Sequence, residues 1–342
     1  MKLSLLSRKC RQASLLMKFP ASLCVALFTA FAVTGCGSDN AAGTESQISE
    51  NCSVELVILG VGQDAAAPQI GNHTDPAWGD GASSALLATS LGLVDHRNGA
   101  RYLFEATPNI SHQLKRLDDI AAQKRPPTEL SAIFITHAHI GHYTGLMFLG
   151  REAAGANNVP VYAMPRLRDF LMTNGPWEQL VTLNNIVLNP LENAQTVAFE
   201  GGISVTPYQL PHRDEYSETV AYVISGEEKS ALFVPDIDSW DEWEMEFGHR
   251  IEDMIASVDY AFLDATFYSD NELPGRDMSK IPHPRVLDMM TRFEGLAPQE
   301  KSKVNFIHIN HTNPIRFVTS PETQDVIGRG FNVARRGDRH CL

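Results

Sequence analysis

The sequence has no excess of positive charge: its 342 residues include 28 lysines and arginines against 41 aspartates and glutamates. The formal net charge of −13 argues against broad nucleic-acid binding, because that function needs a basic surface to displace counterions. No apolar run is long enough to span a bilayer comfortably, since a transmembrane helix needs roughly 20 apolar residues. No repeat or low-complexity block follows residue 49, and no Pro/Gly-rich linker divides the rest. The hydrophobic content of 43% is that of an ordinary globular protein.

Acidic residues are absent from residues 1–35, which carry five basic residues. The remaining 307 residues hold 23 basic and 41 acidic residues, a net charge of −18. Uncharged residues 19–36 follow the basic start, with an almost wholly apolar core over residues 23–33. A basic lead, a short apolar core and small residues at the end are typical of a secretory signal. The pattern is compatible with a start at Met1 or at Met17.

The end of this segment, Val33-Thr34-Gly35-Cys36, resembles the lipobox of bacterial lipoproteins. The resemblance implies cleavage before Cys36, which would then carry lipid and anchor the chain to a membrane. A flexible polar tether over residues 36–51 and a folded domain over residues 52–342 would follow. Gly37 stands where retained inner-membrane lipoproteins usually carry Asp, so we expect the periplasmic face of the outer membrane. A signal cut elsewhere and a plain anchor are the alternatives.

Cysteines are few in the mature chain. Cys10 and Cys24 would leave with the signal and Cys36 would take lipid, which leaves Cys52 and Cys341. In an oxidising periplasm these two can form a disulfide that joins the two ends of the domain. Two free thiols is the other interpretation, and the sequence leaves both open.

Apolar runs rich in Val, Ile and Phe recur through the mature chain and predict strands. The predicted strands are residues 54–59, 84–89, 102–105, 132–136, 159–163, 203–210, 219–224, 231–234, 260–263 and 304–309. The predicted helices are residues 111–122, 142–153, 166–172, 240–256 and 284–293. Strands dominate each half with helices interspersed, which favours one α/β domain of sheets covered by helices.

Three histidines directly follow the apolar residues 132–136: His137, His139 and His142. On an extended backbone, positions two apart point the same way, so His137 and His139 can converge on one point. A turn into a helix can bring His142 alongside. One buried histidine is usually a hydrogen-bonded core residue, but three within six positions predict a metal site, because imidazole is the commonest metal ligand.

Further polar residues come at or near the ends of later apolar runs. If these runs are strands of one sheet, their polar ends can gather at one edge. These residues are His212, Asp236, Asp264, His308 and His311.

This ordered set resembles the metallo-β-lactamase superfamily, whose signature is His-x-His-x-Asp-His followed by a lone His, an Asp and a final His. The resemblance implies a four-layered αβ/βα sandwich with a metal site between two sheets. The metal ligands that it implies are His137, His139, His142, His212, Asp236 and His308.

Residues 54–340 further resemble the pyrroloquinoline quinone biosynthesis protein B branch of that superfamily. The resemblance rests on Ala106-Thr107-Pro108-Asn109-Ile110, Asp264-Ala265-Thr266-Phe267-Tyr268, Arg276-Asp277-Met278, Ile281-Pro282-His283-Pro284 and residues 306–314. Residues 330–334 look like the closing strand of that fold.

The sequence departs from the superfamily at Gly141, which stands where the signature has a metal-binding Asp. Glycine has no side chain to ligate the second metal, so we expect one firm metal and a second that is weak, altered or absent. His142, His308 and a bridge from Asp236 would remain for the second metal. Residues that could replace the missing carboxylate are Asp264, Asp238, His283 and His311.

The sequence also departs from the branch over residues 65–81, where the branch carries a cysteine-rich zinc knuckle and this chain has no cysteine. We expect an irregular loop near the site, in which His73, Asp75 and Trp78 are ordinary loop residues; contact with substrate is the alternative interpretation. The missing knuckle and the export signal argue against a role in making the quinone cofactor.

Metal-assisted hydrolysis is the leading functional hypothesis. Zinc, or alternatively iron or manganese, would be held by His137, His139 and His212, and Asp236 would bridge metals or orient and deprotonate a water molecule. His283 and His311 are candidate proton donors to the leaving group. The substrate would be a small molecule with an ester, lactone, amide or phosphodiester bond.

Two alternatives are a mononuclear non-haem iron oxygenase or hydroxylase, as the branch implies, and a non-catalytic metal-binding lipoprotein. The sequence leaves the oligomeric state open.

Overall fold

The computed structural model describes residues 52–79, 84–122 and 124–342. The export segment predicted over residues 1–35 and the tether predicted over residues 36–51 lie outside these residues. Within the described ranges, no helix combines the length and the apolar character needed to cross a membrane.

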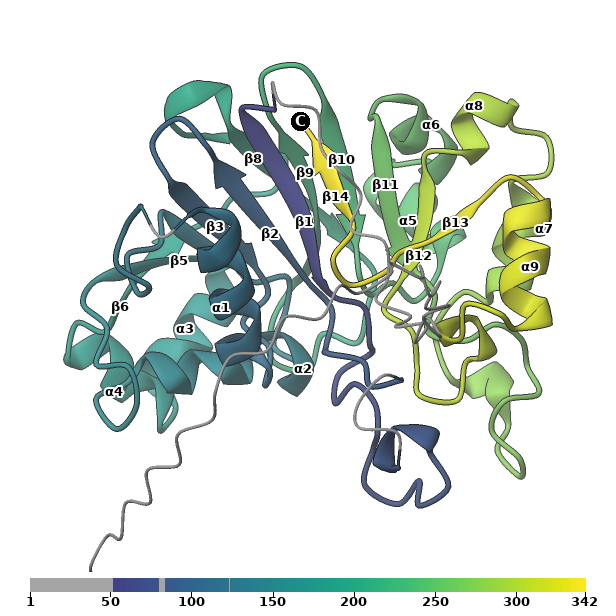
Figure 1. Cartoon of the computed structure of the whole chain (residues 1–342), viewed down its shortest axis with the longest axis horizontal. Helices are drawn as coiled ribbons and strands as arrows, with labels where there is room; N and C mark the ends of the chain where they lie inside the picture. Colours follow the sequence, from purple (N-terminus) through teal and green to yellow (C-terminus); the bar gives the residue numbers. More distant parts are fainter. Residues whose placement is uncertain (1–51, 80–83, 123) are drawn as a thin grey trace, which may run out of the picture. The chain divides into compact units, whose positions relative to one another are not determined.

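Two seven-stranded sheets lie side by side at the centre of the domain, and helices cover the outer face of each (Figure 1). The first sheet has the strand order β14-β1-β2-β3-β4-β5-β6. The second has the order β13-β12-β11-β10-β9-β8-β7. Helices α1, α3 and α4 lie beside the first sheet, and α5 to α9 lie beside the second. The predicted four-layered αβ/βα sandwich is therefore confirmed.

The elements have the following bounds. The first sheet contains β1 Val54–Gly60, β2 Ser90–Asp95, β3 Ala100–Phe104, β4 Ala132–Phe134, β5 Val159–Ala163, β6 Ile186–Pro190 and β14 Arg339–Cys341. The second contains β7 Val197–Ala198, β8 Ser204–Leu210, β9 Thr219–Ser225, β10 Ser230–Val234, β11 Tyr260–Asp264, β12 Val304–Ile307 and β13 Asn332–Val333. The helices are α1 Ile110–Ile120, α2 Ile140–Tyr143, α3 Pro165–Thr173, α4 Trp177–Thr182, α5 Trp240–Phe247, α6 Ile251–Ala256, α7 Val286–Arg292, α8 Pro298–Lys301 and α9 Pro321–Gly328.

Three clusters of buried apolar side chains fill the spaces between the four layers. In β1, Leu56 and Ile58 belong to the cluster between the sheets, whereas Val57 and Leu59 belong to the cluster under α1. This alternation follows from the two-residue period of a strand. The third cluster joins the second sheet to its helices and includes Trp243 of α5. Because strands such as β1 are buried on both faces, they read as continuous apolar runs in the sequence.

One predicted strand is wrong. Residues 84–89 form isolated bridges through Leu86 and Ala88 with the loop at residues 61–67, and β2 begins only at Ser90. The physical reason is that this segment bonds to a loop instead of running beside β1.

Two predicted helices are interrupted. The helix predicted over residues 240–256 divides into α5 and α6, because Gly248 takes a left-handed φ of 76° and ends α5. The helix predicted over residues 142–153 is α2 followed by a 3₁₀ turn, Thr144–Leu149. The other predicted helices are present with small shifts at their ends.

The two ends of the domain meet at the edge of the first sheet. Strand β14 pairs with β1, and Cys341 lies opposite Glu55. Cys52 and Cys341 form a disulfide with their Cα atoms 5.6 Å apart. Of the two interpretations that the sequence leaves open for these cysteines, the disulfide is therefore the one present. The predicted closing strand at residues 330–334 corresponds to β13.

A buried ion pair anchors the described part of the loop between β1 and β2. Arg316 donates from Nη1 to Asp75 Oδ2 (2.7 Å) and from Nη2 to Asp75 Oδ1 (2.9 Å). The guanidinium holds the pKa of the Asp75 carboxyl below its usual range. Asp75 is therefore a structural residue of this loop, as the sequence predicts.

Candidate metal centre

The segment after β4 supplies three histidines. The chain stays extended up to His139, which precedes α2 with φ −91° and ψ 146°, and His142 lies within that helix. His137 and His142 are buried, each only 1% exposed. The centroid of the His137 ring lies 4.4 Å from that of His139 and 4.2 Å from that of His142. Extended backbone followed by a turn thus brings the three imidazoles together.

The second sheet supplies His212, Asp236 and His308. They follow β8, β10 and β12, which run in the same direction, so the three carboxyl ends meet at one edge of the sheet. His308 has a φ of 63°, a left-handed conformation that is uncommon for a residue other than glycine. Such backbone conformations cluster at functional sites, where the surrounding structure maintains them.

His137, His139 and His212 form a first group that can hold a metal ion. His139 Nδ1 lies 2.9 Å from His137 Nε2 and 3.2 Å from His212 Nε2. The other ring nitrogens are held from outside: His137 Nδ1 lies 2.8 Å from Thr136 Oγ1, and His212 Nδ1 lies 2.7 Å from Asp238 Oδ1. Contacts of this kind fix the orientation of metal-binding histidines.

Asp236 lies at the centre of the cluster. Its Oδ2 is 3.0 Å from His142 Nε2 and 3.2 Å from His308 Nε2, and its Oδ1 is 3.8 Å from His212 Nε2. Asp236 Oδ2, His142 Nε2 and His308 Nε2 are buried and have no hydrogen-bond partner among the described residues. Buried polar atoms without a partner are rare in folded proteins. A metal ion between these atoms would satisfy them, so the residues present fit such an ion.

Asp64 is a candidate metal ligand that was not predicted from the sequence. Its Oδ1 lies 3.6 Å from His142 Nε2, and Asp64, His142 and His308 form another group whose ligand atoms lie within 4.8 Å of one another. Asp64 comes four residues after β1. The pattern that drew attention to Asp236, a polar residue after an apolar run, applies to Asp64 as well.

The two candidate proton donors have different surroundings. His283 Nδ1 lies 2.7 Å from Asp264 Oδ2, and both residues form a group with Asp236. His311 belongs to none of the possible metal groups found among the described residues, and its Nδ1 lies 2.9 Å from Asn72 Nδ2.

Both aspartates proposed from the sequence as replacements for the carboxylate missing at position 141 already have a histidine as partner. Asp238 bonds to His212 and Asp264 bonds to His283.

The cluster shifts the pKa of its own members. Burial raises the pKa of the Asp236 carboxyl, but the imidazoles of His308 and His142 outweigh burial and hold that pKa well below its usual value. Burial lowers the pKa of His142, whereas Glu105 and Asp236 raise it, and the net pKa is well above its usual value. Without metal, His142 therefore keeps a proton that a metal ion must displace.

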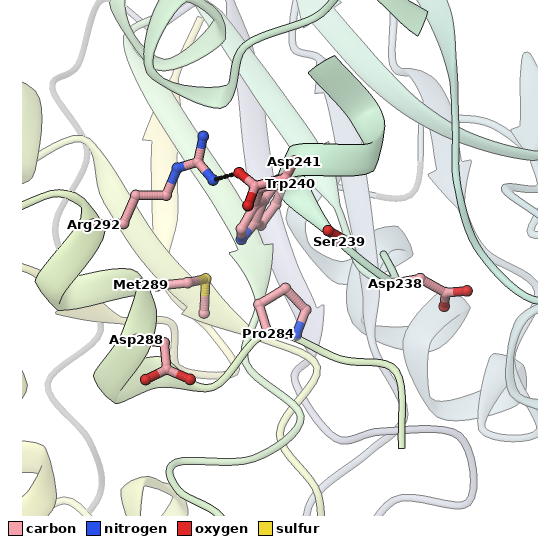
Figure 2. Close-up of a pocket in the computed structure, with 8 residues that line it drawn as sticks. All are labelled: Asp238, Ser239, Trp240, Asp241, Pro284, Asp288, Met289 and Arg292. Atoms are coloured by element: carbon pink, nitrogen blue, oxygen red, sulfur yellow. Dashed lines mark hydrogen bonds and ion pairs between the residues drawn. The ribbon is translucent and has the colours of Figure 1, made fainter. Parts of the chain in front are cut away.

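A pocket of about 470 Å³ (Figure 2) is connected to the cluster through one of its lining residues. It includes Asp238, whose carboxylate accepts the His212 hydrogen bond. The single guanidinium in its lining, Arg292, is bound to Asp241 (2.5 Å) and to Glu252 (2.7 Å). The pocket is lined by Asp238, Ser239, Trp240, Asp241, Pro284, Asp288, Met289 and Arg292.

Two facing mixed sheets, with histidines and aspartates gathered where their strands end, define a metallo-β-lactamase fold. A family model described as the beta-lactamase superfamily domain matches residues 100–309, and the chain belongs to this superfamily.

Within the superfamily the chain resembles the coenzyme PQQ synthesis protein B branch. That protein from Gluconobacter oxydans is 22% identical over 312 residues, which cover 83% of this chain and 97% of the relative. The Pseudomonas putida protein is 25% identical over 287 residues, which cover 75% of this chain and 89% of the relative.

Two solved structures share the fold. Zn²⁺-bound PqqB from Methylobacterium extorquens has a TM-score of 0.66 at 20% identity, covering 84% of this chain and 100% of that one. A diphosphatase from the PhnP family has a TM-score of 0.60 at 21% identity, and the match covers 84% of this chain and 98% of that one.

Proposed function

We propose that the domain is a metal-dependent hydrolase acting on a small molecule that contains an ester, lactone, amide or phosphodiester bond. The observation that carries the proposal is the group His137, His139 and His212 beside the buried Asp236. Three protein ligands are typical of catalytic zinc sites, which keep one position open for water or substrate. A divalent metal ion supplies Lewis acidity at such a site and lowers the pKa of a coordinated water towards ~7.

The side chains around this group have separate roles in the proposal. Asp236 orients the attacking water and accepts its proton, since the neighbouring imidazoles keep its carboxylate ionised. His283 keeps Nδ1 on Asp264, so its Nε2 is the atom that donates a proton to the leaving group. His142 and His308 would hold a second metal ion or stabilise the negative charge that develops, and His311 stays a second candidate donor.

The pocket in Figure 2 is the place we propose for the rest of the substrate. Its carboxylates outnumber its one guanidinium, which is already paired. Because like charges repel across a site, a neutral or cationic substrate group fits this pocket better than an anionic one.

Oxygen chemistry at a single iron is the second candidate, and one observation favours it. His137, His142 and Asp236 form a two-histidine, one-carboxylate group, which is the ligand set of many non-haem iron oxygenases.

Metal removal and reloading test these alternatives. Protein stripped with a chelator should lose hydrolysis of activated esters, lactones and bis(nitrophenyl) phosphate by about 10³-fold, because a catalytic metal contributes several kcal/mol. Zinc should restore it. Oxygen uptake by iron-loaded protein without hydrolysis would favour the oxygenase, and metal binding with neither activity would leave a binding module.

We also propose that the chain is exported and held at the periplasmic face of the outer membrane by lipid on Cys36. The disulfide between Cys52 and Cys341 supports export, because such bonds persist in oxidising compartments. When the full chain is expressed in bacteria, the mature protein should sediment with membranes and have a mass that begins at an acylated Cys36. Cys36→Ser should abolish both. Identical mass and fractionation of the two proteins would contradict the anchor.

A further inference from the structure

Gly141 stands where the superfamily signature has an aspartate, and its neighbour in space is Asp64. A Cβ atom added to Gly141 would lie 2.4 Å from Asp64 Cα and 2.6 Å from Asp64 Oδ1. Real Cβ atoms do not approach other atoms this closely, so only glycine fits here. Asp64 therefore fills the space into which a side chain at position 141 would project.

The backbone holds Asp64 in place through the strand end that carries His308. Gln63 N donates to Ile309 O (3.0 Å), and Ile309 N donates to Val61 O (2.7 Å). Gly62 also forms bridges with Ile309 and with Ala88. The Gln63 and Asn310 side chains are hydrogen-bonded to each other as well. Asp64 and His308 thus belong to segments that are bonded directly together.

The carboxylate of Asp64 faces the atoms that lack partners. Asp64, His142 and His308 each offer a ligand atom within 4.8 Å of the others, and both histidine Nε2 atoms are buried without a hydrogen bond. Asp236 Oδ2 lies 3.0 Å and 3.2 Å from the same two nitrogens. Two imidazoles and two carboxylates make a complete set of four ligands of the types that zinc prefers.

We infer that Asp64 supplies the carboxylate that Gly141 lacks, so that the chain holds a second metal ion on Asp64, His142 and His308 with Asp236 shared between the two ions. The second site is then rebuilt from the loop after β1 instead of from α2. Of the outcomes expected from the sequence for the second metal (weak, altered or absent), the inference selects an altered site, in which Asp64 replaces the usual carboxylate. The inference rests on the metal site of the proposed function but not on hydrolysis.

Counting metal ions tests the inference without any substrate. Metal-free protein would be titrated with Zn²⁺ by calorimetry, and bound ions would be counted by native mass spectrometry. Wild type should bind two ions per chain. Asp64→Asn, which keeps the size but removes the charge, should leave the first affinity unchanged and weaken the second by at least ~100-fold, since even residues that only support a ligand contribute 10–100-fold.

A matched control is Asp214→Asn. Asp214 is a 70% exposed carboxylate that pairs with Arg166, so the variant loses the same charge without touching the cluster and should bind like wild type. Gly141→Ala provides an independent arm. The added methyl group is not a ligand, but it collides with Asp64. This variant should therefore also bind the second ion more weakly and bind the first ion with unchanged affinity. Circular dichroism of each metal-free variant checks that the fold is kept.

One ion in wild type, or two ions with unchanged affinities in Asp64→Asn, would overturn the inference. Two Asp64-dependent ions without hydrolysis would support it while rejecting the proposed function. If no metal binds to wild type, both the second metal site and the proposed function are rejected.

Discussion

Replacing Asp236 by Asn is expected to lower hydrolysis by at least ~10³-fold, which corresponds to about 4 kcal/mol of transition-state stabilisation. Asp236 approaches more of the candidate metal ligands than any other residue of the cluster: its two oxygens lie within 4 Å of His137, His142, His212 and His308. The substitution removes the negative charge that these imidazoles surround. In the proposed mechanism it also removes the proton acceptor.

Metal binding should fall in the same variant. In calorimetric titrations with Zn²⁺, Asp236→Asn should weaken the binding of both ions, because the carboxylate is shared between them. His137→Ala should instead abolish binding at the first group.

The control for this prediction is Asp238→Asn. Asp238 is hydrogen-bonded to the cluster at His212 Nδ1 (2.7 Å), so its loss should cost metal affinity the 10–100-fold typical of an orienting contact. If Asp236→Asn kept full activity and both ions, its central role would be rejected.

Removing the disulfide is expected to destabilise the domain by up to about 5 kcal/mol, the value that the entropy model gives for so long a loop. Cys52 and Cys341 are 289 positions apart in sequence. The bond therefore restricts the unfolded chain strongly. It also fastens β14, a three-residue strand at the edge of the first sheet. Without it, β14 should open more readily than the rest of the sheet.

The measurement is urea unfolding of the metal-free protein with and without reductant, compared with Cys52→Ser/Cys341→Ser. Removing metal first matters, because a bound ion adds stability of its own. Reduced wild type and the double variant should unfold at the same lower urea concentration, and reductant should not affect the variant. Equal stability of oxidised and reduced wild type would contradict the prediction.

The central strands could be predicted because both of their faces are buried, so that each strand appears in the sequence as an apolar run. The arrangement of these strands as a four-layered sandwich was implied by the resemblance to the superfamily. The three histidines after β4 were recognisable for a local reason, since their spacing alone brings them together. The part of the site that could not be predicted depends on contacts between segments that are distant in the sequence. Asp64 looks like any loop residue until the bonds between Gln63 and Ile309 place it against Gly141.

Short elements escaped prediction for a related reason. Strand β7 has two residues and β14 has three, too few to display a period. The break between α5 and α6, in contrast, had a signal in Gly248, a residue that often ends helices.

The candidate ligands come from widely separated positions, from Asp64 near the start of the described chain to His308 near its end. In an unfolded chain these side chains are scattered, so an ion bound in the native state acts as a reversible cross-link between both sheets. At a free metal concentration 100 times the dissociation constant, one such ion adds about 2.7 kcal/mol to the free energy of unfolding. The supply of metal would then control how long the folded protein persists as well as whether it is active.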